Sequence, residues 1–339
     1  MKRVRIGVLG AGAWGKNHVR TISGMGEAEL SAVADKDATV REKLARQYPA
    51  ALITDDPARV IEQSDAVIVA TPARTHAELA MKAMEAGRPT LVEKPFALTV
   101  ADAERMAELA ARKGVPLLVG HLLEYHPVVE KLRAMIQEKS LGDIFYLYSQ
   151  RVNLGQIRPD ENALWSFGPH DVSVALFLLG EAPVTVAAQG HSYLQKGIED
   201  IVFLHMNFRS GVMAHVQMSW LDPHKERRLT VVGSRQMAVF DDMAGREKLR
   251  IYDKGVDRPP EYRSYGESLT IREGDIFIPR VPNTEPLQVQ LQHFVRVARG
   301  EEPPRADAQD GVRVVRVLES ASRSLAQEGA PIPVGGVST

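Results

Sequence analysis

The sequence contains no cysteine, which excludes disulfide bonds, thiolate chemistry and cysteine-ligated zinc and suits a reducing compartment. It has almost no net charge, with 42 basic against 43 acidic residues, so no overall field favours nucleic acid or an anionic membrane. It also lacks an apolar run near the roughly 18 residues of a membrane span, and its first residues do not read as a signal peptide. We therefore expect a cytoplasmic protein that binds neither nucleic acid nor membrane.

Metal catalysis is not indicated either, because the sequence has no HExxH motif or comparable cluster of close ligands. What is present is ordinary for a folded protein. Apolar residues make up 44% and charged residues 25% of the 339 residues. At about 100–200 residues per domain, this length predicts two domains.

Short apolar runs alternate with helical patterns from residue 3 to about residue 120. The runs have the length and composition of buried parallel strands. Amphipathic stretches at 76–86 and 100–113 have the pattern of helices between them. The alternation predicts an α/β fold whose first domain, residues 1–121, is a doubly wound parallel sheet. The expected strands are 4–9, 30–34, 66–70, 90–92 and 117–119.

After about residue 122 the pattern changes to longer runs with a period of two. Several such runs in succession are typical of a mostly antiparallel sheet with one open face. We expect a second α/β domain, residues 122–339, whose free face holds a substrate or a second subunit. Residues 253–286, rich in Pro, Gly and charge, predict a loop or extended excursion. The expected strands are 144–153, 184–191, 202–208, 211–220, 227–232 and 237–241, and the expected helices are 128–138, 287–299 and 310–327.

A glycine motif, GxGxxG, lies between the first strand and the next helical stretch and consists of Gly10, Gly12 and Gly15. Such glycines permit a tight turn, close approach of the backbone to a pyrophosphate, and helix-to-strand packing. Asp35 follows the second strand, where a carboxylate accepts the ribose hydroxyl protons of NAD and repels a 2′-phosphate. Lys36 softens that repulsion, so NAD is expected and NADP stays open. Trp14, inside the turn, packs on its own helix or contacts the cofactor.

The segment Glu93-Lys94-Pro95 follows an apolar strand and so lies at the carboxyl edge of the sheet, where doubly wound folds bind ligands. A lysine there can stabilise the alkoxide that develops as a hydride leaves, although a solvated surface charge is the simpler interpretation. His170 precedes an apolar helical stretch, and the pKa of histidine suits accepting a hydroxyl proton near neutrality. With ten histidines in the chain, that property alone does not single out His170.

Four motifs carry a family resemblance: Gly10–Gly15, Thr71-Pro72 with His76, Glu93–Pro95 and Gly168–Asp171. Together they resemble the Gfo/Idh/MocA family of NAD(P)-dependent sugar and inositol oxidoreductases, and the resemblance covers nearly the whole chain. It implies a Rossmann domain followed by an α/β domain with a large open sheet. Members usually form dimers or tetramers through that sheet, so a homodimer or homotetramer is expected.

The resemblance also implies roles for individual residues. Lys94 and His170 would face the nicotinamide and the reacting carbon, and Glu93 would approach the nicotinamide ribose. The adenosine side would be lined by Thr71 and Pro72, with His76 nearby. The cofactor-binding residues implied in this way are Gly10, Ala11, Gly12, Ala13, Trp14, Gly15, Asp35, Lys36, Thr71, Pro72, His76, Glu93 and Lys94.

Two positions depart from the pattern of the family. Many members carry an aspartate four residues before the histidine, where this chain has Ser166. Proton transfer must then rest on His170 and Lys94, with Asp171 available to orient the ring. The second departure is the segment 123–125, Leu-Glu-Tyr, where many members have arginines. The charge of the substrate pocket is therefore altered.

Within the family, the segments Glu124–Pro127, Arg151–Gly155 and Asn162–Asp171 most resemble the nucleotide-sugar 3-dehydrogenases. These oxidise the C3 hydroxyl of UDP-N-acetylglucosamine or its uronic acid. Arginine forms forked bonds to phosphate, although each polar side chain here is equally well a surface residue or part of a turn. The implied substrate-binding residues are Tyr125, Arg151, Asn153, Arg158, Asn162, Ser166 and His170.

The resemblance thus predicts an NAD-dependent dehydrogenase that acts on the C3 hydroxyl of a UDP-amino sugar. The alternative within the family is oxidation of an inositol or free sugar, or reduction of a keto sugar. A different class, a sensor that binds NAD(P) without turnover, is a further alternative for which Ser166 leaves room.

Overall fold

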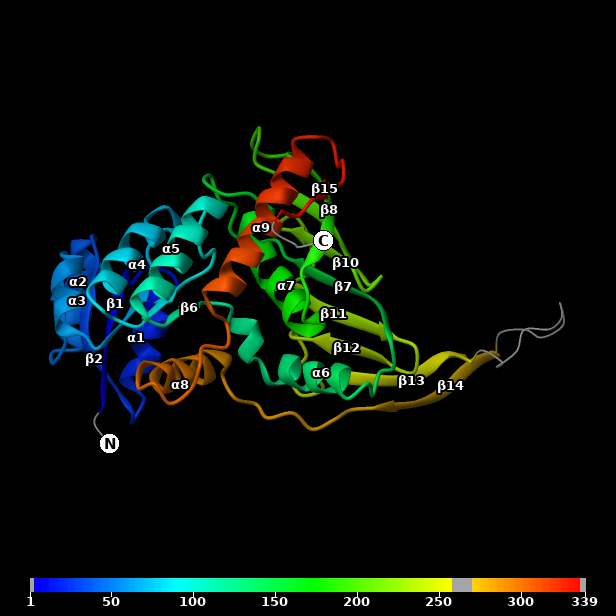
Figure 1. Cartoon of the computed structure of the whole chain (residues 1–339), viewed down its shortest axis with the longest axis horizontal. Helices are drawn as coiled ribbons and strands as arrows, with labels where there is room; N and C mark the ends of the chain where they lie inside the picture. The colour runs from blue at the N-terminus through cyan, green and yellow to red at the C-terminus, as the bar shows by residue number, and fades with distance from the viewer. Residues whose placement is uncertain (1–2, 258–269, 336–339) are drawn as a thin grey trace. The chain divides into compact units, whose positions relative to one another are not determined.

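The computed structural model describes residues 3–257 and 270–335, which fold into two compact units (Figure 1). The first unit takes the chain up to Tyr125 and again over Thr284–Arg316, and the second takes the rest. The predicted division into domains 1–121 and 122–339 stays a prediction.

The first unit contains a six-stranded sheet in the order β3-β2-β1-β4-β5-β6, and all of its strand pairs are parallel. Every residue of β4 and β5 is buried, as expected for strands covered on both faces. The predicted doubly wound sheet is therefore confirmed. The strands are β1 (Val4–Leu9), β2 (Ala28–Ala34), β3 (Leu52–Thr54), β4 (Ala66–Val69), β5 (Thr90–Val92) and β6 (Leu117–Val119).

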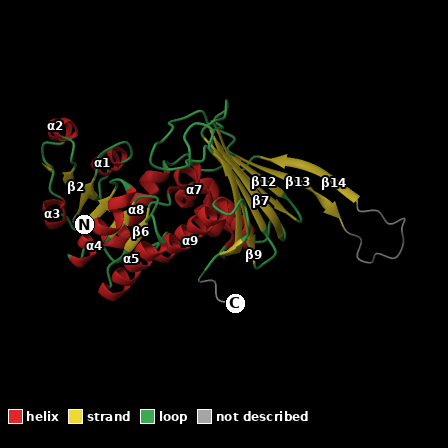
Figure 2. Ribbon diagram, turned by 90° about the horizontal axis from the view of Figure 1, so that it is seen from above, coloured by secondary structure: helices red, strands yellow, loops and turns green. Residues whose placement is uncertain are grey.

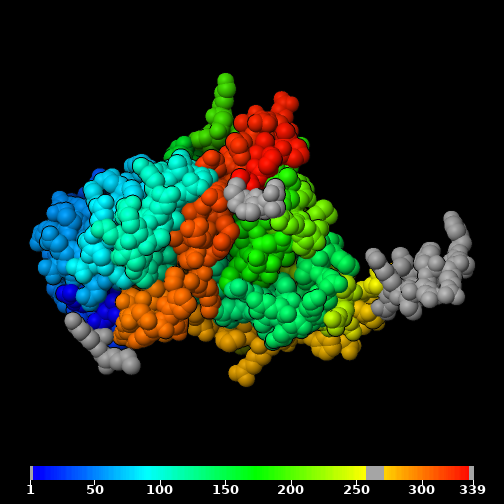
Figure 3. Space-filling view, in the orientation of Figure 1, coloured from blue at the N-terminus to red at the C-terminus, as the bar shows by residue number. Residues whose placement is uncertain are grey.

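Helices join these strands, and α8 (Pro286–Ala298) returns to this unit from late in the chain. Leu291 and Phe294 of α8 are buried in the same apolar core as Ile6 and Ile22. Gln288 of α8 is exposed, and part of the surface of this helix is visible in orange in Figure 3. The other helices are α1 (Gly15–Ser23), α2 (Ala38–Gln47), α3 (Pro57–Gln63), α4 (His76–Glu85), α5 (Val100–Lys113) and the short 3₁₀ turns η1 (Ala73–Thr75) and η2 (Leu122–Tyr125).

The second unit contains a nine-stranded sheet in the order β14-β13-β12-β11-β7-β10-β9-β8-β15. Among the pairs of its described strands, only β7 with β10 is parallel, which confirms the expected mostly antiparallel sheet. The strands are β7 (Ile144–Val152), β8 (Pro183–His191), β9 (Ile201–Phe208), β10 (Met213–Ser219), β11 (Glu226–Gly233), β12 (Met237–Asp241), β13 (Leu249–Asp257), β14 (Thr270–Phe277) and β15 (Ile332–Pro333).

At 253–286, where a loop or extended excursion was predicted, the loop alternative is wrong over part of the range. The end of β13 and the whole of β14 form a strand pair there, while 258–269 lies outside the described residues. Gly274 of the edge strand β14 and Gly255 of its neighbour β13 lower the strand propensity of these segments. The high content of Pro, Gly and charged residues therefore did not indicate this pair of strands.

One face of this sheet carries helices and the other is open (Figure 2). Along β9, Leu204 and Met206 are buried, whereas the alternate residues Phe203 and His205 are exposed. This period of two confirms the expected open face. The helices are α6 (Pro127–Gln137), α7 (Ala163–Leu179) and α9 (Ala308–Leu325), of which α9 begins in the first unit. Among the described residues, no helix has the length and apolar character that a membrane crossing requires.

Candidate active site

The glycine turn after β1 has the geometry that its three glycines were expected to provide. Gly10 has a φ of 86°, and a Cβ on Gly15 would lie 2.0 Å from the carbonyl oxygen of Gly10. Both positions therefore require glycine. A Cβ on Gly12, by contrast, would meet nothing within 4 Å. The space above Gly12 fits the approach of a pyrophosphate to the start of α1.

This difference between the glycines predicts opposite effects of two substitutions. Gly12→Val points into open space, so we expect an unchanged melting temperature and an NAD affinity lowered about tenfold or more. Gly15→Ala forces the backbone of the turn to shift, so we expect a loss of about 1–3 kcal/mol of stability. Calorimetry of unfolding and of NAD binding measures both effects. Wild-type NAD affinity in Gly12→Val would show that the cofactor does not pass over this turn.

Asp35 is held at the end of β2 by two backbone amides. Its Oδ2 accepts a hydrogen bond of 2.7 Å from the amide of Ala11, and its Oδ1 accepts one of 2.9 Å from the amide of Asp37. Each carboxylate oxygen keeps a further lone pair. The carboxylate is thus fixed beside the glycine turn, where it can accept the hydroxyl protons of a ribose and repels a phosphate. Lys36 is exposed next to it.

Glu93 links the glycine turn to the end of β5. Its buried Oε1 accepts hydrogen bonds from Nε1 of Trp14 at 2.6 Å and from Nε2 of His18 at 2.7 Å. Its Oε2 accepts the backbone amide of Lys94 at 3.1 Å. Burial opposes ionisation of Glu93, but the His18 bond and the charges of His18 and Lys94 outweigh it and lower its pKa. His18 was not among the sequence candidates, although it lies three residues after the glycine motif.

Lys94 therefore lies at the same edge of the sheet as the glycine turn. Its side chain is half-buried, and its backbone amide is connected through Glu93 to Trp14. β4 lies between β1 and β5, so the segments that follow these three strands are neighbours at their carboxyl ends. This is the edge at which the Glu-Lys-Pro segment was predicted to lie.

His76 joins the segments that follow β4 and β5. Its Nδ1 lies 2.9 Å from the carbonyl oxygen of Pro95, and its Nε2 lies 2.8 Å from that of Thr71. Burial lowers the pKa of His76, although both carbonyl contacts act in the opposite direction. The ring is almost inaccessible, while Thr71 is half-buried and Pro72 is exposed. In this position His76 fixes the backbone of the two segments that it joins.

Tyr125 lies in the core of the first unit and has no accessible surface. Its ring centroid is 5.6 Å from that of His293, and the guanidinium of Arg305 lies 4.8 Å from the ring centroid. Burial raises the pKa of its hydroxyl. In this position the side chain offers no surface to a substrate.

In the second unit, α7 carries both His170 and Ser166. Asn162 caps the helix, since its Oδ1 accepts the amide of Trp165 at 3.1 Å, and its Nδ2 donates to Glu199 at 2.6 Å. The local role of Asn162 is therefore that of a helix cap. Ser166 is buried, one turn before the half-buried His170 on the same side of the helix.

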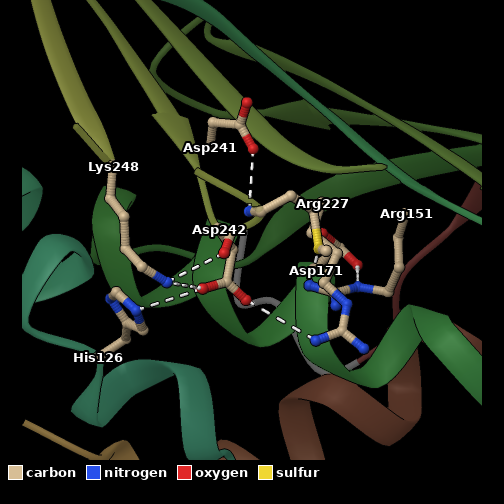
Figure 4. A network of polar contacts seen from close by, with 8 residues as sticks. His126, Arg151, Asp171, Arg227, Asp241, Asp242 and Lys248 are labelled. Atoms are coloured by element: carbon tan, nitrogen blue, oxygen red, sulfur yellow. Dashed lines mark hydrogen bonds and ion pairs between the residues drawn. The ribbon is translucent and has the colours of Figure 1, made fainter. Parts of the chain in front are cut away.

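Asp171 and Arg151 form a buried ion pair (Figure 4). Nε of Arg151 donates to Oδ2 of Asp171 at 2.5 Å, and Nη2 donates to Oδ1 at 3.4 Å. The carboxylate that was expected to orient His170 is thus engaged by an arginine. Arg151, a candidate for substrate binding, directs two of its guanidinium donors to that carboxylate.

The two remaining polar candidates lie between β7 and α7. Asn153 is half-buried, and its amide occupies the space that a Cβ on Gly155 would need. Nε of Arg158 lies 3.0 Å from a carboxylate oxygen of Glu161, and its side chain is 44% exposed. Such a partly exposed pair contributes little to stability. Among the described residues, no group of three or more His, Cys, Asp or Glu side chains is arranged to hold a metal ion.

Comparisons with known families match both parts of the chain. A model of the oxidoreductase family with an NAD-binding Rossmann fold, GFO_IDH_MocA, matches residues 4–121. A model of the GFO/IDH/MocA C-terminal domain matches residues 129–239. Together the two models cover most of the first sheet and much of the second.

Individual relatives extend this match over the whole length. One relative is an oxidoreductase from Magnetospirillum magnetotacticum MS-1 with a known crystal structure. Its sequence is 34% identical to this chain, the match covers 94% of this chain and 99% of the relative, and the TM-score is 0.81. Inositol 2-dehydrogenase 2 of Saccharopolyspora erythraea is 31% identical over 63% of this chain and 66% of its own length. UDP-N-acetylglucosamine 3-dehydrogenase of Acidithiobacillus ferrooxidans is 25% identical over 93% of this chain and 95% of its own length. The chain therefore belongs to the Gfo/Idh/MocA family and is an NAD-dependent oxidoreductase.

Proposed function

We propose that this enzyme oxidises the C3 hydroxyl of a UDP-amino sugar, UDP-N-acetylglucosamine or its uronic acid, to the 3-keto sugar with NAD. The observation that supports it best is the connection from Lys94 through Glu93 to Trp14 in the glycine turn. It couples a half-buried cation to the dinucleotide-binding turn. A cation beside the reacting oxygen stabilises the negative charge that develops there when an alcohol is oxidised.

The proposed chemistry divides between two side chains. When bound, NAD supplies the nicotinamide ring that accepts the hydride from C3. His170 accepts the hydroxyl proton, and the ammonium group of Lys94 stabilises the negative charge on the oxygen until the carbonyl forms. Asp171 takes no part in this transfer, because its carboxylate is engaged by Arg151. Ser166 carries no charge and does not assist as a base.

The choice of substrate rests on two kinds of similarity. The relative from Acidithiobacillus ferrooxidans that is named a UDP-N-acetylglucosamine 3-dehydrogenase matches 93% of this chain. The segment Asn162–Asp171, which comprises the N-cap and the first half of α7, is one of the three segments that together most resemble such enzymes, with Glu124–Pro127 and Arg151–Gly155. We also propose that the enzyme is a homodimer or homotetramer joined through the open sheet face, where Tyr146, Phe203 and Met213 are exposed.

A second candidate is the oxidation of an inositol or free sugar. It is favoured by the relative named inositol 2-dehydrogenase 2, whose identity to this chain is higher, at 31%. The proposed roles of Lys94 and His170 are the same in both reactions. The two candidates differ in the charge of the substrate, which is anionic for a UDP-sugar and neutral for an inositol.

A panel of substrates distinguishes the candidates. The protein is incubated with NAD and UDP-sugars, inositols and free sugars, and the products are analysed by mass spectrometry for the loss of two hydrogens. Oxidation confined to UDP-N-acetylglucosamine or its uronic acid supports the proposal. Turnover of inositols alone establishes the second candidate, and no turnover with any substrate contradicts both and leaves the NAD-binding sensor.

A further inference from the structure

Two arginines face each other across neighbouring strands of the second unit. Arg227 of β11 is the register partner of Arg151 of β7. Like charges placed directly opposite on one face of a sheet destabilise it. Both side chains lie on the face covered by α7, because Asp171 of α7 binds Arg151. The sequence therefore keeps an unfavourable pair of cations at one point of this sheet.

The nearby carboxylates do not neutralise both arginines. Asp171 accepts both hydrogen bonds from Arg151. Oδ1 of Asp242 lies 2.7 Å from Nζ of Lys248 and 3.5 Å from Nε2 of His126. The bond from His126 and the charge of Lys248 hold the pKa of Asp242 well below its usual value, despite burial. Among the described residues of this cluster, the permanent cations Arg151, Arg227 and Lys248 thus share the carboxylates of Asp171 and Asp242 (Figure 4).

Arg227 is the cation that this arrangement leaves weakly paired. Among the described residues, the one carboxylate oxygen within 4.0 Å of its guanidinium is Oδ2 of Asp242, at 3.8 Å, which is too long for a hydrogen bond. Its side chain remains 44% exposed, although burial and the charge of Arg151 lower its pKa. A guanidinium has five N–H donors in a planar fork that matches carboxylate and phosphate. Arg227 can therefore offer most of its donors to a ligand.

The position of Arg227 relates it to the proposed chemistry. Asp171, which accepts the fork of Arg151, directly follows His170 in α7. Consecutive Cα atoms lie about 3.8 Å apart, so the arginine pair and the proposed base belong to one small region of the second unit. An anionic group bound at Arg227 would be attached to a substrate within reach of α7.

We propose that Arg227, beside the Arg151–Asp171 pair, binds an anionic group of the substrate, a phosphate or a carboxylate. The inference rests on the proposed function, since it concerns how the same substrate is selected. A bound anion relieves the repulsion between the two arginines and supplies the charge that the two carboxylates lack. A neutral polyol supplies no negative charge to this site. The site therefore selects for UDP-sugars or sugar acids against inositols.

The test compares Arg227→Gln with Arg228→Gln. Arg228 is the next residue of β11, has a similar exposed fraction of 46%, and lies on the opposite face, 3.7 Å from Asp241. Steady-state kinetics use UDP-N-acetylglucosamine, its uronic acid and myo-inositol. We expect Arg227→Gln to raise KM for the anionic substrates about tenfold or more with little change in kcat, as the loss of a charge-assisted bond does. Arg228→Gln is expected to behave as wild type.

The pattern of losses identifies the group that is bound. Equal losses for both UDP-sugars indicate the diphosphate, and a loss confined to the uronic acid indicates the carboxylate. Unchanged KM values for both in Arg227→Gln overturn the proposal. If Arg227→Gln is unstable, Arg227→Lys keeps the charge without the fork, and an intermediate KM is expected.

Ligand binding separates this inference from the proposed reaction. Calorimetry measures the affinity of wild type and both variants for UDP and for glucuronate in the presence of NAD, without any turnover. If no sugar is oxidised but Arg227→Gln weakens UDP or glucuronate about tenfold, the anion site stands and the reaction is wrong. If wild type and Arg227→Gln bind each of the two probes equally, or if neither protein binds them, the anion site is wrong.

Discussion

Replacing Lys94 by methionine is expected to lower kcat about 10²–10³-fold or more, because the developing charge on the substrate oxygen loses its stabilising cation. NAD affinity should change little. The hydrogen bond from position 94 to Glu93 comes from the backbone amide and survives the substitution. Trp14 and His18 also keep their bonds to Glu93. The dinucleotide turn is therefore preserved while the ammonium group is lost.

A comparison of two variants separates catalysis from folding. Lys113→Met, at the exposed end of α5, removes a cation of the same kind from the same unit and should retain wild-type turnover. Single-turnover kinetics measure the chemical step, and calorimetry measures NAD binding. Turnover in Lys94→Met within about threefold of wild type contradicts the assignment of Lys94, since loss of a stabilising donor costs far more.

The second large effect is on stability. Asp171→Asn is expected to lower the free energy of unfolding by about 3–5 kcal/mol, as the loss of one partner does in a buried ion pair. The side chains of Arg151 and Asp171 are only 12% and 8% exposed. Removing the carboxylate leaves Arg151 buried directly opposite Arg227. Urea denaturation of the purified variant gives the change.

Two further variants test the cause of this loss. The double variant Arg151→Met/Asp171→Leu removes both charges and should recover most of the stability, because an apolar pair of similar volume packs without desolvation cost. Glu161→Gln breaks the partly exposed pair with Arg158 and should cost at most about 1 kcal/mol. An Asp171→Asn variant as stable as Glu161→Gln would mean that Arg151 finds another partner.

The cofactor turn was predictable because its signals are local. Gly10 and Gly15 impose backbone geometry within six residues, Gly12 leaves open space between them, and Asp35 follows the next strand along the chain. The strands 4–9, 90–92 and 117–119 have the bounds that the sequence predicted, since buried parallel strands read as continuous apolar runs. Short-range steric rules determine all of these features.

The polar contacts of the second unit were not predictable in the same way. The partner of Arg151 is determined by the packing of α7 on the sheet. The sequence around Arg151 does not indicate that this partner is Asp171. Arg227 was missed for the same reason. The alternation at 227–232 places Arg227 on the same face as Leu229 and Val231. Its weak pairing can be recognised only once β7 is known to be the neighbouring strand, because Arg151 of β7 then lies opposite.

Tyr125 and α8 show a second limit of sequence patterns. Tyr125 was a candidate for substrate binding, yet tertiary packing buries it beside Arg305. The amphipathic pattern at 287–299 predicted a helix, and α8 is there, but the pattern does not say which sheet the apolar face covers. Long-range packing decided both outcomes. The implied roles of Glu93, His76, Thr71 and Pro72 toward the cofactor stay predictions.

The most direct test of the proposed reaction uses UDP-N-acetylglucosamine that carries deuterium at C3. The wild-type enzyme is incubated with this substrate and NAD, and mass spectrometry determines where the deuterium goes. The proposal predicts that the reduced cofactor carries the deuterium and that the sugar product has lost it. Reduced cofactor without deuterium would place the oxidation at another carbon. No reduction of NAD, either by this substrate or by its uronic acid deuterated at C3, would contradict the proposed substrate.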